Sequence, residues 1–478
     1  MLFNSATFLF LFLPIAIIGF YGLRRFGWLQ VAEVWLFLAS LTFYSFWDVR
    51  YLPLLLGGIV CNYYLGITIG RHRTRWILVL GIAFNLALLG FFKYADFFIS
   101  NVNAISDSSF DLLHIVLPIG ISFITFEQIA YLVDSYRGES RTDYGFVNYG
   151  NFVAFFPQLI AGPIFHHREI IRQIQSLTAG RSVLASQIAT GLFVLSLGLF
   201  KKVIIADNLA PMADPVFADV ASASIFDAWV AALAYTFQLY FDFSGYSDMA
   251  IGLGLLFGIE LPVNFNSPYK SLNIAEFWRR WHITLGRFLR DYVYIPLGGS
   301  RFGIPHTLYA LLVTMFLGGL WHGAGWTFAI WGLLHGVYLV IYHVWSRHGV
   351  ALPRLLAWLL TFVAVIFAWV LFRAESLSDA MVLWSAMAGL DDISLPNSLR
   401  GMLGFLGDEV VWNAPVHSSG IEIFVLLPMI YFVVSQPNVS ELRERFVPNV
   451  RFELAAVALA GVAVANLGQE TAFIYFQF

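Results

Sequence analysis

Long apolar runs recur along the whole chain and constrain its fold more than any other feature. Many are long enough to cross a bilayer as a helix, which takes about 20 apolar residues. Only 12% of the residues are charged, against about 25% in an ordinary soluble protein. The runs do not alternate as the strands of a membrane barrel do. We therefore expect one all-α, polytopic integral membrane domain over residues 1–478, with roughly 11–13 membrane segments including re-entrant helices.

The N-terminal part contains the most clearly delimited spans. We predict them near residues 6–22, 31–47, 52–70, 76–92 and 112–133. Alternate loops carry the basic residues Arg24 and Arg25, then Arg71, Arg73 and Arg75, then Arg137 and Arg141. The positive-inside rule places these loops in the cytoplasm and the N-terminus outside. The first run has no basic region before it, so we expect a retained helix and not a cleaved signal peptide.

Segment 145–165 is apolar but interrupted by Pro157, Gly162 and Pro163. Irregular backbone at membrane depth must be shielded from lipid. We expect a re-entrant or half-buried helix that lines a cavity. Further along, Lys201 and Lys202 end an apolar run, and we expect them to extend to the cytoplasmic face.

Residues 262–301 are the most polar part of the chain, with six basic residues against two acidic ones. Asn273 followed by Glu276 is typical of a helix N-terminus. On a helical wheel of about 100° per residue, Arg279, Arg280, Arg287 and Arg290 share one face, opposite a face of Trp, Phe and Leu. This pattern predicts an amphipathic helix in the cytoplasmic interface. His282 falls at the edge of the apolar face, where it can point into the protein.

The stretch from Gly318 to Gly336 carries two histidines, His322 and His335, inside an apolar run. A histidine at membrane depth is costly and is a candidate functional residue, although a structural histidine is about equally common. No acidic residue occurs between Pro305 and Glu375. The partner of His322 must therefore come from elsewhere in the chain or be the substrate.

His335 does not have the spacing of a second ligand. It lies 13 residues beyond His322, which on an unbroken helix is about 220° around and about 20 Å along the axis. We interpret His335 as structural and expect no metal site, since no zinc-type spacing occurs and Cys61 is the one cysteine.

Asp242 and Asp248 lie between two apolar runs. Two interpretations remain open: an intramembrane proton relay, or a helix break at Ser244 and Gly245 with the aspartates capping the flanking helices. We favour the helix break.

Six ordered stretches together resemble the membrane-bound O-acyltransferase (MBOAT) family. They are LPIGISFITFE (117–127), FFPQLIAGPI (155–164), YFDFSGYSDMAIGLG (240–254), NFNSPY (264–269), EFWRRWHITLGRFLRDYVYIPLGG (276–299) and GGLWHG (318–323). They are most similar to the bacterial branch that acetylates alginate, cellulose or peptidoglycan. The branch that D-alanylates teichoic acid is more distant.

The resemblance implies helices arranged in a ring around a tunnel through a multi-pass protein of the bacterial inner membrane. It places the invariant-type histidine at His322 and a second functional histidine at His282. It further implies a cytoplasmic thioester donor, acetyl-CoA, and no permanently bound cofactor. We expect the donor to contact Arg279, Arg280, Trp281 and Trp321. The expected partners are a periplasmic SGNH-type acetyltransferase, a polysaccharide synthase or export complex, and the lipid bilayer.

The aromatic tail TAFIYFQF (471–478) resembles a partner-peptide motif of the D-alanylation branch, which suggests an acyl-carrying role for Tyr475. A phenol with a pKa of about 10 is easier to deprotonate than an alkyl hydroxyl. A histidine base could therefore activate Tyr475 to take acetyl from a thioester. The alternative role for Tyr475 is an aromatic anchor at the membrane interface.

Two other functions compete with acetyl transfer to a polysaccharide such as cellulose or alginate. One is a proton-coupled transporter or flippase that uses His322 and the aspartates. The other is an MBOAT enzyme that acylates a lipid or peptidoglycan. No basic tract of the kind that binds nucleic acid is present.

Overall fold

The computed structural model describes residues 1–140, 144–160, 162–390, 393–405, 411–413, 417–468 and 473–474. These residues are almost entirely helical, which confirms the all-α class. Within the described ranges one short sheet occurs, in which β1 (Ser394–Pro396) pairs in parallel with β2 (Val411–Asn413). The chain forms two compact units. Unit 1 holds Met1–Phe200, Gly245–Asn264 and Leu442–Gln477, and unit 2 holds Lys201–Ser244 and Phe265–Glu441.

The helices of unit 1 come mainly from the N-terminal part of the chain. They are η1 (Phe8–Phe12), α1 (Leu13–Arg25), α2 (Leu29–Ser45), α3 (Leu52–His72), α4 (Arg75–Leu89), η3 (Gly90–Tyr94), α5 (Ala95–Ser106), α6 (Ile121–Arg137), α7 (Phe146–Ala154), α8 (Phe156–Leu159), α9 (His167–Thr178), α10 (Ala185–Phe200) and α22 (Val450–Ala465). The helices of unit 2 are η4 (Lys201–Ala206), α11 (Asp207–Ala218), α13 (Ile274–Arg280), α14 (Ile283–Leu289), η7 (Arg290–Tyr294), α15 (Ile304–His322), α16 (Trp326–Trp345), α17 (Arg354–Arg373), α18 (Leu377–Met387), α19 (Arg400–Leu403) and α20 (Ile423–Ser435). Helices α12 (Ile225–Leu256) and α21 (Val439–Arg445) belong partly to each unit.

The described residues contain seven helices long and apolar enough to cross a membrane, or eight if the bent pair Ile423–Ser435 and Val439–Arg445 is one span. The protein is therefore a multi-pass membrane protein. Several other predicted segments are shorter apolar helices, such as Leu29–Ser45 and Leu377–Met387.

Two N-terminal boundaries differ from the sequence prediction. The span predicted at 76–92 continues through η3 and α5, so that helix runs from Arg75 to Ser106. The helix predicted at 112–133 begins only at Ile121, because Pro118 and the left-handed Gly120 (φ +72°) precede it. The interruption expected within 145–165 is confirmed, since α7 ends at Ala154 and the short α8 follows, with Pro157 in its first turn. Residues 149–160 are buried and not half-buried.

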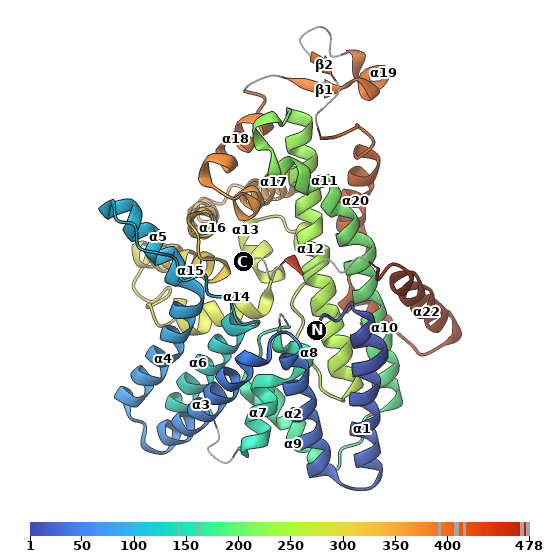
Figure 1. Ribbon diagram of the computed structural model, residues 1–478. Helices are drawn as coiled ribbons and strands as arrows, with labels where there is room; N and C mark the ends of the chain where they lie inside the picture. The colour runs from blue at the N-terminus through green and yellow to red at the C-terminus, as the bar shows by residue number, and fades with distance from the viewer. Residues whose placement is uncertain are drawn as a thin grey trace. The chain divides into compact units, whose positions relative to one another are not determined.

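In unit 1, α6 packs against both α3 and α4 (Figure 1), and a buried cluster of amide side chains joins these helices. We call Asn62, Asn85 and Gln128 the amide network. The Nδ2 of Asn85 donates to Oδ1 of Asn62 at 2.7 Å, and Nδ2 of Asn62 donates back at 3.2 Å. Nδ2 of Asn62 also donates to Oε1 of Gln128. Such interhelical hydrogen bonds hold helices together where lipid supplies no hydrophobic driving force.

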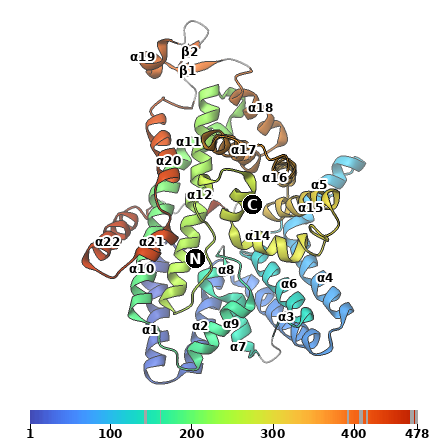
Figure 2. The ribbon, with the colours of Figure 1, turned by 180° about the vertical axis from the view of Figure 1, so that it is seen from behind.

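In unit 2, α15 and α16 form a tight helical hairpin, and α17 packs against α16 (Figure 2). Helix α13 also packs against α16 (Figure 1). The crossing is close because Gly319 of α15 faces Gly332 of α16. A methyl group at Gly319 would collide with the Phe328 carbonyl oxygen, and one at Gly332 with the Met315 carbonyl oxygen. Small residues allow this backbone approach in membrane helices. The crossing places the end of α15 beside the first turns of α16.

Candidate active site

His322 is the last residue of α15 and is buried, with 4% of its surface exposed. Its ring packs edge to face against Trp331 of α16 and against Trp321, each with a centroid distance of 5.0 Å. Phe372 of α17 lies 5.3 Å away. Three helices of unit 2 therefore enclose this imidazole with aromatic rings.

His282 occupies a break between two helices and not the middle of one. The continuous amphipathic helix predicted here is wrong, because α13 ends at Arg280 and α14 begins at Ile283. Trp281 is extended and His282 is left-handed (φ +43°). A non-glycine residue in this conformation stores strain and is often found at functional sites. The predicted N-terminus at Asn273 is confirmed, since its side chain accepts from the Glu276 N–H at 2.8 Å.

The break turns His282 fully inward, with 0% of its surface exposed. Its Nδ1 accepts a hydrogen bond from the Leu285 N–H at 3.3 Å. Burial lowers the pKa of His282 from 6.5 to about 3. The imidazole is therefore neutral at physiological pH, and since Nδ1 is the acceptor, Nε2 carries the proton.

The structure brings these two histidines together although 40 positions separate them in the sequence. Their ring centroids lie 6.5 Å apart, and Trp321 contacts both. Phe243 packs on His282 at 4.7 Å. We call His282, His322, Trp321, Trp331 and Phe372 the histidine pocket. It combines two imidazoles with a water-poor aromatic wall, an environment that strengthens electrostatic and proton-transfer effects.

His335 lies nearer to His322 than predicted, because the two residues are not on one helix. Extended residues Gly323 and Gly325 separate α15 from α16. His335 then packs on the same Trp331, at 4.8 Å. Its Nδ1 accepts from the Trp278 indole N–H at 3.3 Å. Its contacts are those of a residue that fixes the wall of the pocket.

A cavity of about 480 Å³ lies beside these residues and has three arginines in its lining, Arg279, Arg287 and Arg290. We call it the arginine cavity. Its other lining residues come from α13 to α16 and include Trp278, Ile283, Thr314, Met315 and Leu339. A cavity with an apolar floor and several guanidinium groups suits an elongated ligand that carries phosphate.

Of the four residues expected to contact a donor, Arg279 alone lines this cavity. Arg280 is held by Glu276 at 3.0 Å and by the Asn266 carbonyl oxygen at 3.1 Å. Trp281 and Trp321 are buried. Arg287 and Arg290 could have been chosen from the wheel, which places them on the face of Arg279. No sequence signal pointed to Trp331 or Phe372.

Asp242 is not a helix cap. The predicted break at Ser244 and Gly245 is wrong, because α12 runs unbroken from Ile225 to Leu256. Asp242 instead pairs with Lys202 at 2.6 Å, and Lys202 also pairs with Asp207 at 2.7 Å. Lys202 is buried, so its predicted extension to the cytoplasmic face is wrong as well. Mutual charge compensation keeps these groups inside.

Tyr475 lies outside the described residues. Two positions earlier, Phe473 is buried and stacks on Tyr246 with centroids 4.7 Å apart. At least this part of the aromatic tail is therefore packed into unit 1.

Comparison with known proteins agrees with the resemblance seen in the sequence. The profile of MBOAT, the membrane-bound O-acyltransferase family, matches residues 135–378. The peptidoglycan O-acetyltransferase of Helicobacter pylori is 43% identical over 100% of this chain and 98% of its own length. The probable alginate O-acetylase AlgI of Pseudomonas aeruginosa is 46% identical over 81% of this chain and 75% of its own. The teichoic acid D-alanyltransferase of Bacillus subtilis is 28% identical over 54% of this chain and 69% of its own. This protein belongs to the membrane-bound O-acyltransferase family and is an O-acyltransferase.

Proposed function

We propose that this protein takes acetyl from acetyl-CoA at the cytoplasmic face of the bacterial inner membrane and passes it across for O-acetylation of an extracellular polysaccharide. The observation that carries the proposal is the pairing of His282 and His322, whose ring centroids lie 6.5 Å apart in a buried aromatic pocket. Relatives named for acetylation of peptidoglycan and of alginate support a glycan acceptor.

The two histidines have different parts in this proposal. His322 is the general base, because imidazole is the side chain that most often takes up a proton from a nucleophile in enzymes. His282 is neutral and carries its proton on Nε2, so it is a hydrogen-bond donor. Its role is to stabilise the negative oxygen that develops when the thioester carbonyl is attacked. Removing such a donor costs about 100- to 1000-fold in rate in other enzymes.

The arginine cavity is the proposed site for the phosphates of the donor. Trp278 in its lining donates a hydrogen bond to His335. His335 and His322 both pack on Trp331. A pantetheine arm that extends from the arginine cavity would direct the thioester toward the base.

In the proposed relay, His322 removes the phenol proton of Tyr475 and the phenolate attacks the acetyl carbonyl. The carbon–sulfur bond breaks, and the coenzyme A thiolate takes up the proton that His322 received from the phenol, which returns His322 to its neutral form. An acetyl ester of a phenol is activated for onward transfer. The proposed recipient is a periplasmic SGNH-type transferase that works beside a polysaccharide synthase or export complex.

A direct test uses purified protein with acetyl-CoA labelled in the acetyl group. We expect label on the peptide that contains Tyr475, and no label there in Tyr475→Phe. If Tyr475→Phe still exports acetyl at the wild-type rate, the relay is wrong, while the role of His322 can stand. If the wild-type protein never takes acetyl from acetyl-CoA, the proposed donor is wrong.

The acceptor is identified by alkaline release of acetate from isolated polymers of cells with and without the gene. Loss of acetate from peptidoglycan or from an exopolysaccharide such as cellulose or alginate names the polymer. Label recovered only in lipid would contradict a polysaccharide acceptor.

A further inference from the structure

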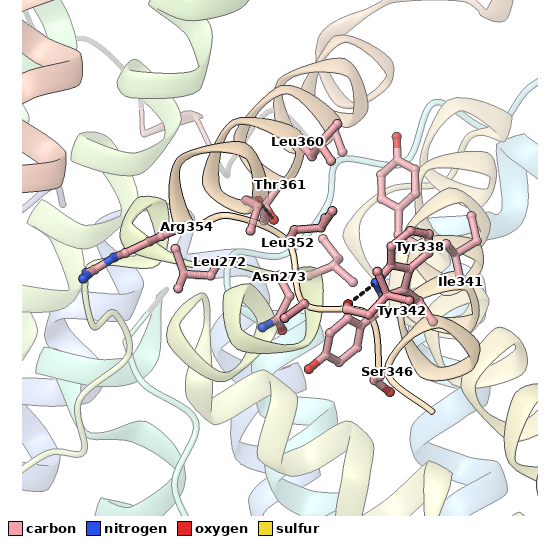
Figure 3. Close-up of a pocket in the computed structure, with 16 residues that line it drawn as sticks. Leu272, Asn273, Tyr338, Ile341, Tyr342, Ser346, Leu352, Arg354, Leu360 and Thr361 are labelled. Carbon is pink, nitrogen blue, oxygen red and sulfur yellow. Dashed lines mark hydrogen bonds between the residues drawn. The ribbon is translucent and has the colours of Figure 1, made fainter. Parts of the chain in front are cut away.

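Unit 2 contains a second, larger cavity that the acetyl-transfer proposal does not use. It measures about 760 Å³ and lies between the start of α13, the end of α16 and the start of α17 (Figure 3). We call it the α16–α17 cavity. Most of its lining is aliphatic or aromatic, and includes Leu272, Ile274, Ile341, Leu352 and Leu360. Its size falls within the range of ordinary ligand sites, about 300–1000 Å³.

The charge in the lining of this cavity has one sign, and the neighbouring Glu276, which accepts from the Leu272 N–H at 2.9 Å, is paired with Arg280. The lining contains Arg354 and no acidic residue. Arg347 lies in the loop that joins α16 to α17, beside the cavity residue Ser346. Neither arginine forms an ion pair with any residue that the structure describes. The cavity therefore offers uncompensated positive charge next to an apolar interior.

The cavity also contains tyrosine, tryptophan and arginine side chains of the kind that contact lipid headgroups. Tyr338 and Tyr342 contribute to the wall formed by α16, and Arg354 lies on the opposite side at the start of α17, with its guanidinium directed away from the tyrosines (Figure 3). Trp345 is fixed by its indole hydrogen bond to the Val350 carbonyl oxygen at 2.9 Å. Trp and Tyr are enriched at the level of lipid headgroups.

The basic residues of the loop between α16 and α17 indicate on which face of the membrane the cavity opens. Arg347 and Arg354 make the α16–α17 loop basic, and the positive-inside rule assigns such a loop to the cytoplasm. The cytoplasmic leaflet carries the anionic lipids that attract basic residues. Free phosphate would contact the arginines but leave the apolar interior unfilled. An uncharged lipid would fill the apolar interior but form no ion pair with the arginines.

We propose that the α16–α17 cavity binds one acyl chain of an anionic phospholipid, with the lipid phosphate held at the rim by Arg354. The site reaches the histidine pocket through ring contacts. Tyr338 packs on His335 at 5.7 Å, and His335 packs on Trp331. A bound lipid would thus support the wall against which His322 lies.

The first test uses the wild-type protein in vesicles that contain phosphatidylglycerol with a photoreactive group on one acyl chain. We expect adducts on cavity residues of α16 and α17, between Tyr338 and Ser346 and between Ala357 and Ala364. We expect fewer adducts when the photoreactive lipid is phosphatidylcholine. Equal labelling of the exposed non-cavity leucines Leu355 and Leu359, or equal labelling by both lipids, would overturn the proposal.

The second test compares two neighbouring leucines of α17 that are both about half exposed, Leu360 in the cavity and Leu359 outside it. Native mass spectrometry counts the phosphatidylglycerol retained after detergent washing. Leu360→Trp should lose the retained lipid and Leu359→Trp should keep it. Equal retention in the two variants would contradict the proposal.

A charge variant separates a lipid headgroup from a free anion. Arg354→Gln should weaken phosphatidylglycerol binding by about fivefold, the effect of one basic residue near an anionic surface. The control Arg301→Gln changes an exposed arginine outside the cavity and should have no effect. Added inorganic phosphate should not displace the lipid. Displacement by phosphate at millimolar concentration would show a simple anion site and refute the lipid assignment.

Discussion

The histidine pocket and the amide network are both buried clusters of polar groups in a membrane protein, and they satisfy those groups differently. In the amide network, Asn62 and Asn85 donate to each other's side-chain oxygen. Each also donates to a carbonyl oxygen of its own helix, Gly58 at 2.9 Å and Gly81 at 2.8 Å. In the histidine pocket, aromatic rings surround the imidazoles on several sides.

This difference indicates that the amide network stabilises the fold, whereas the histidine pocket takes part in the reaction. Amides that satisfy one another hold helices at a fixed distance and offer nothing to a substrate. An imidazole enclosed by aromatic rings lies in a low-dielectric site, where a proton transfer or a hydrogen bond to a developing charge has a larger energetic effect than in water. Substitutions in the pocket should therefore change the rate of acetyl transfer, whereas substitutions in the amide network should change stability.

The largest effect is expected for His322→Gln. Loss of the general base should lower acetyl transfer by about 1000-fold, within the usual range for such residues. The measurement is transfer of labelled acetyl by purified protein, normalised to folded protein. The matched control is His335→Gln, a second buried histidine on Trp331, which should retain most of the activity. If His335→Gln is as inactive as His322→Gln, the pocket's wall and not its base limits the rate.

A smaller loss, about 100-fold in kcat, is expected for His282→Gln, because one oxyanion donor is removed. This variant should also alter the pH dependence of stability. Burial lowers the pKa of His282 to about 3, so below about pH 6.5 the unfolded state binds a proton that the folded state does not. Wild-type stability should thus fall on acidification, and His282→Gln should fall less. Thermal unfolding in detergent at pH 7.5 and pH 5 measures this, and identical pH dependence would refute a buried neutral His282.

A change in substrate affinity is expected for the arginine cavity. Arg279→Gln or Arg287→Gln should raise KM for acetyl-CoA by about tenfold, the cost of one charge-assisted contact of about 1.5 kcal/mol. The value of kcat should stay near that of the wild type. Arg301→Gln serves as a control for basic charge outside the cavity. A fall in kcat with unchanged KM would place these arginines in a structural role.

The smallest effect on activity is expected in the amide network. Asn85→Ala removes the amide that donates to Oδ1 of Asn62 and should lower the free energy of unfolding by about 1 kcal/mol, with unchanged kcat. The double variant Asn62→Leu/Asn85→Leu removes both amides and should recover part of that loss. Chemical denaturation of the single and double variants measures the coupling. A strong loss of kcat without loss of stability would break the distinction between the two regions.

Much of the fold could be read from the sequence, because helix length and hydropathy follow directly from burial in lipid. The broken segment at 145–165 was predicted from Pro157 and Gly162, since proline cannot continue a helix and local chemistry suffices to show it. The helix break predicted at Ser244 and Gly245 was wrong because local chemistry does not decide the structure there. Tertiary contacts around α12, including the pairing of Asp242 with Lys202, outweigh the weak local preference for a turn.

The candidate site was only partly predictable. The resemblance selected His282 and His322. Neither the helical wheel nor the residue spacing could show that their rings lie side by side, because a contact between residues about 40 positions apart depends on how the helices pack. The residues around His282 have no local preference that would predict the helix break there. The break coincides with the left-handed backbone conformation of the buried His282. The position of His335 was missed because the glycines at 323 and 325 were treated as part of one helix.

The most direct test of the account uses proteoliposomes with labelled acetyl-CoA on the side of the arginine cavity and labelled products collected on the other side. The wild-type protein should deliver acetyl to the far side only when the donor is on the near side. The double variant His282→Gln/His322→Gln, folded and inserted as the wild type, should deliver none above background. Equal delivery by the double variant would contradict the central claim that these two histidines form the acetyl-transfer site.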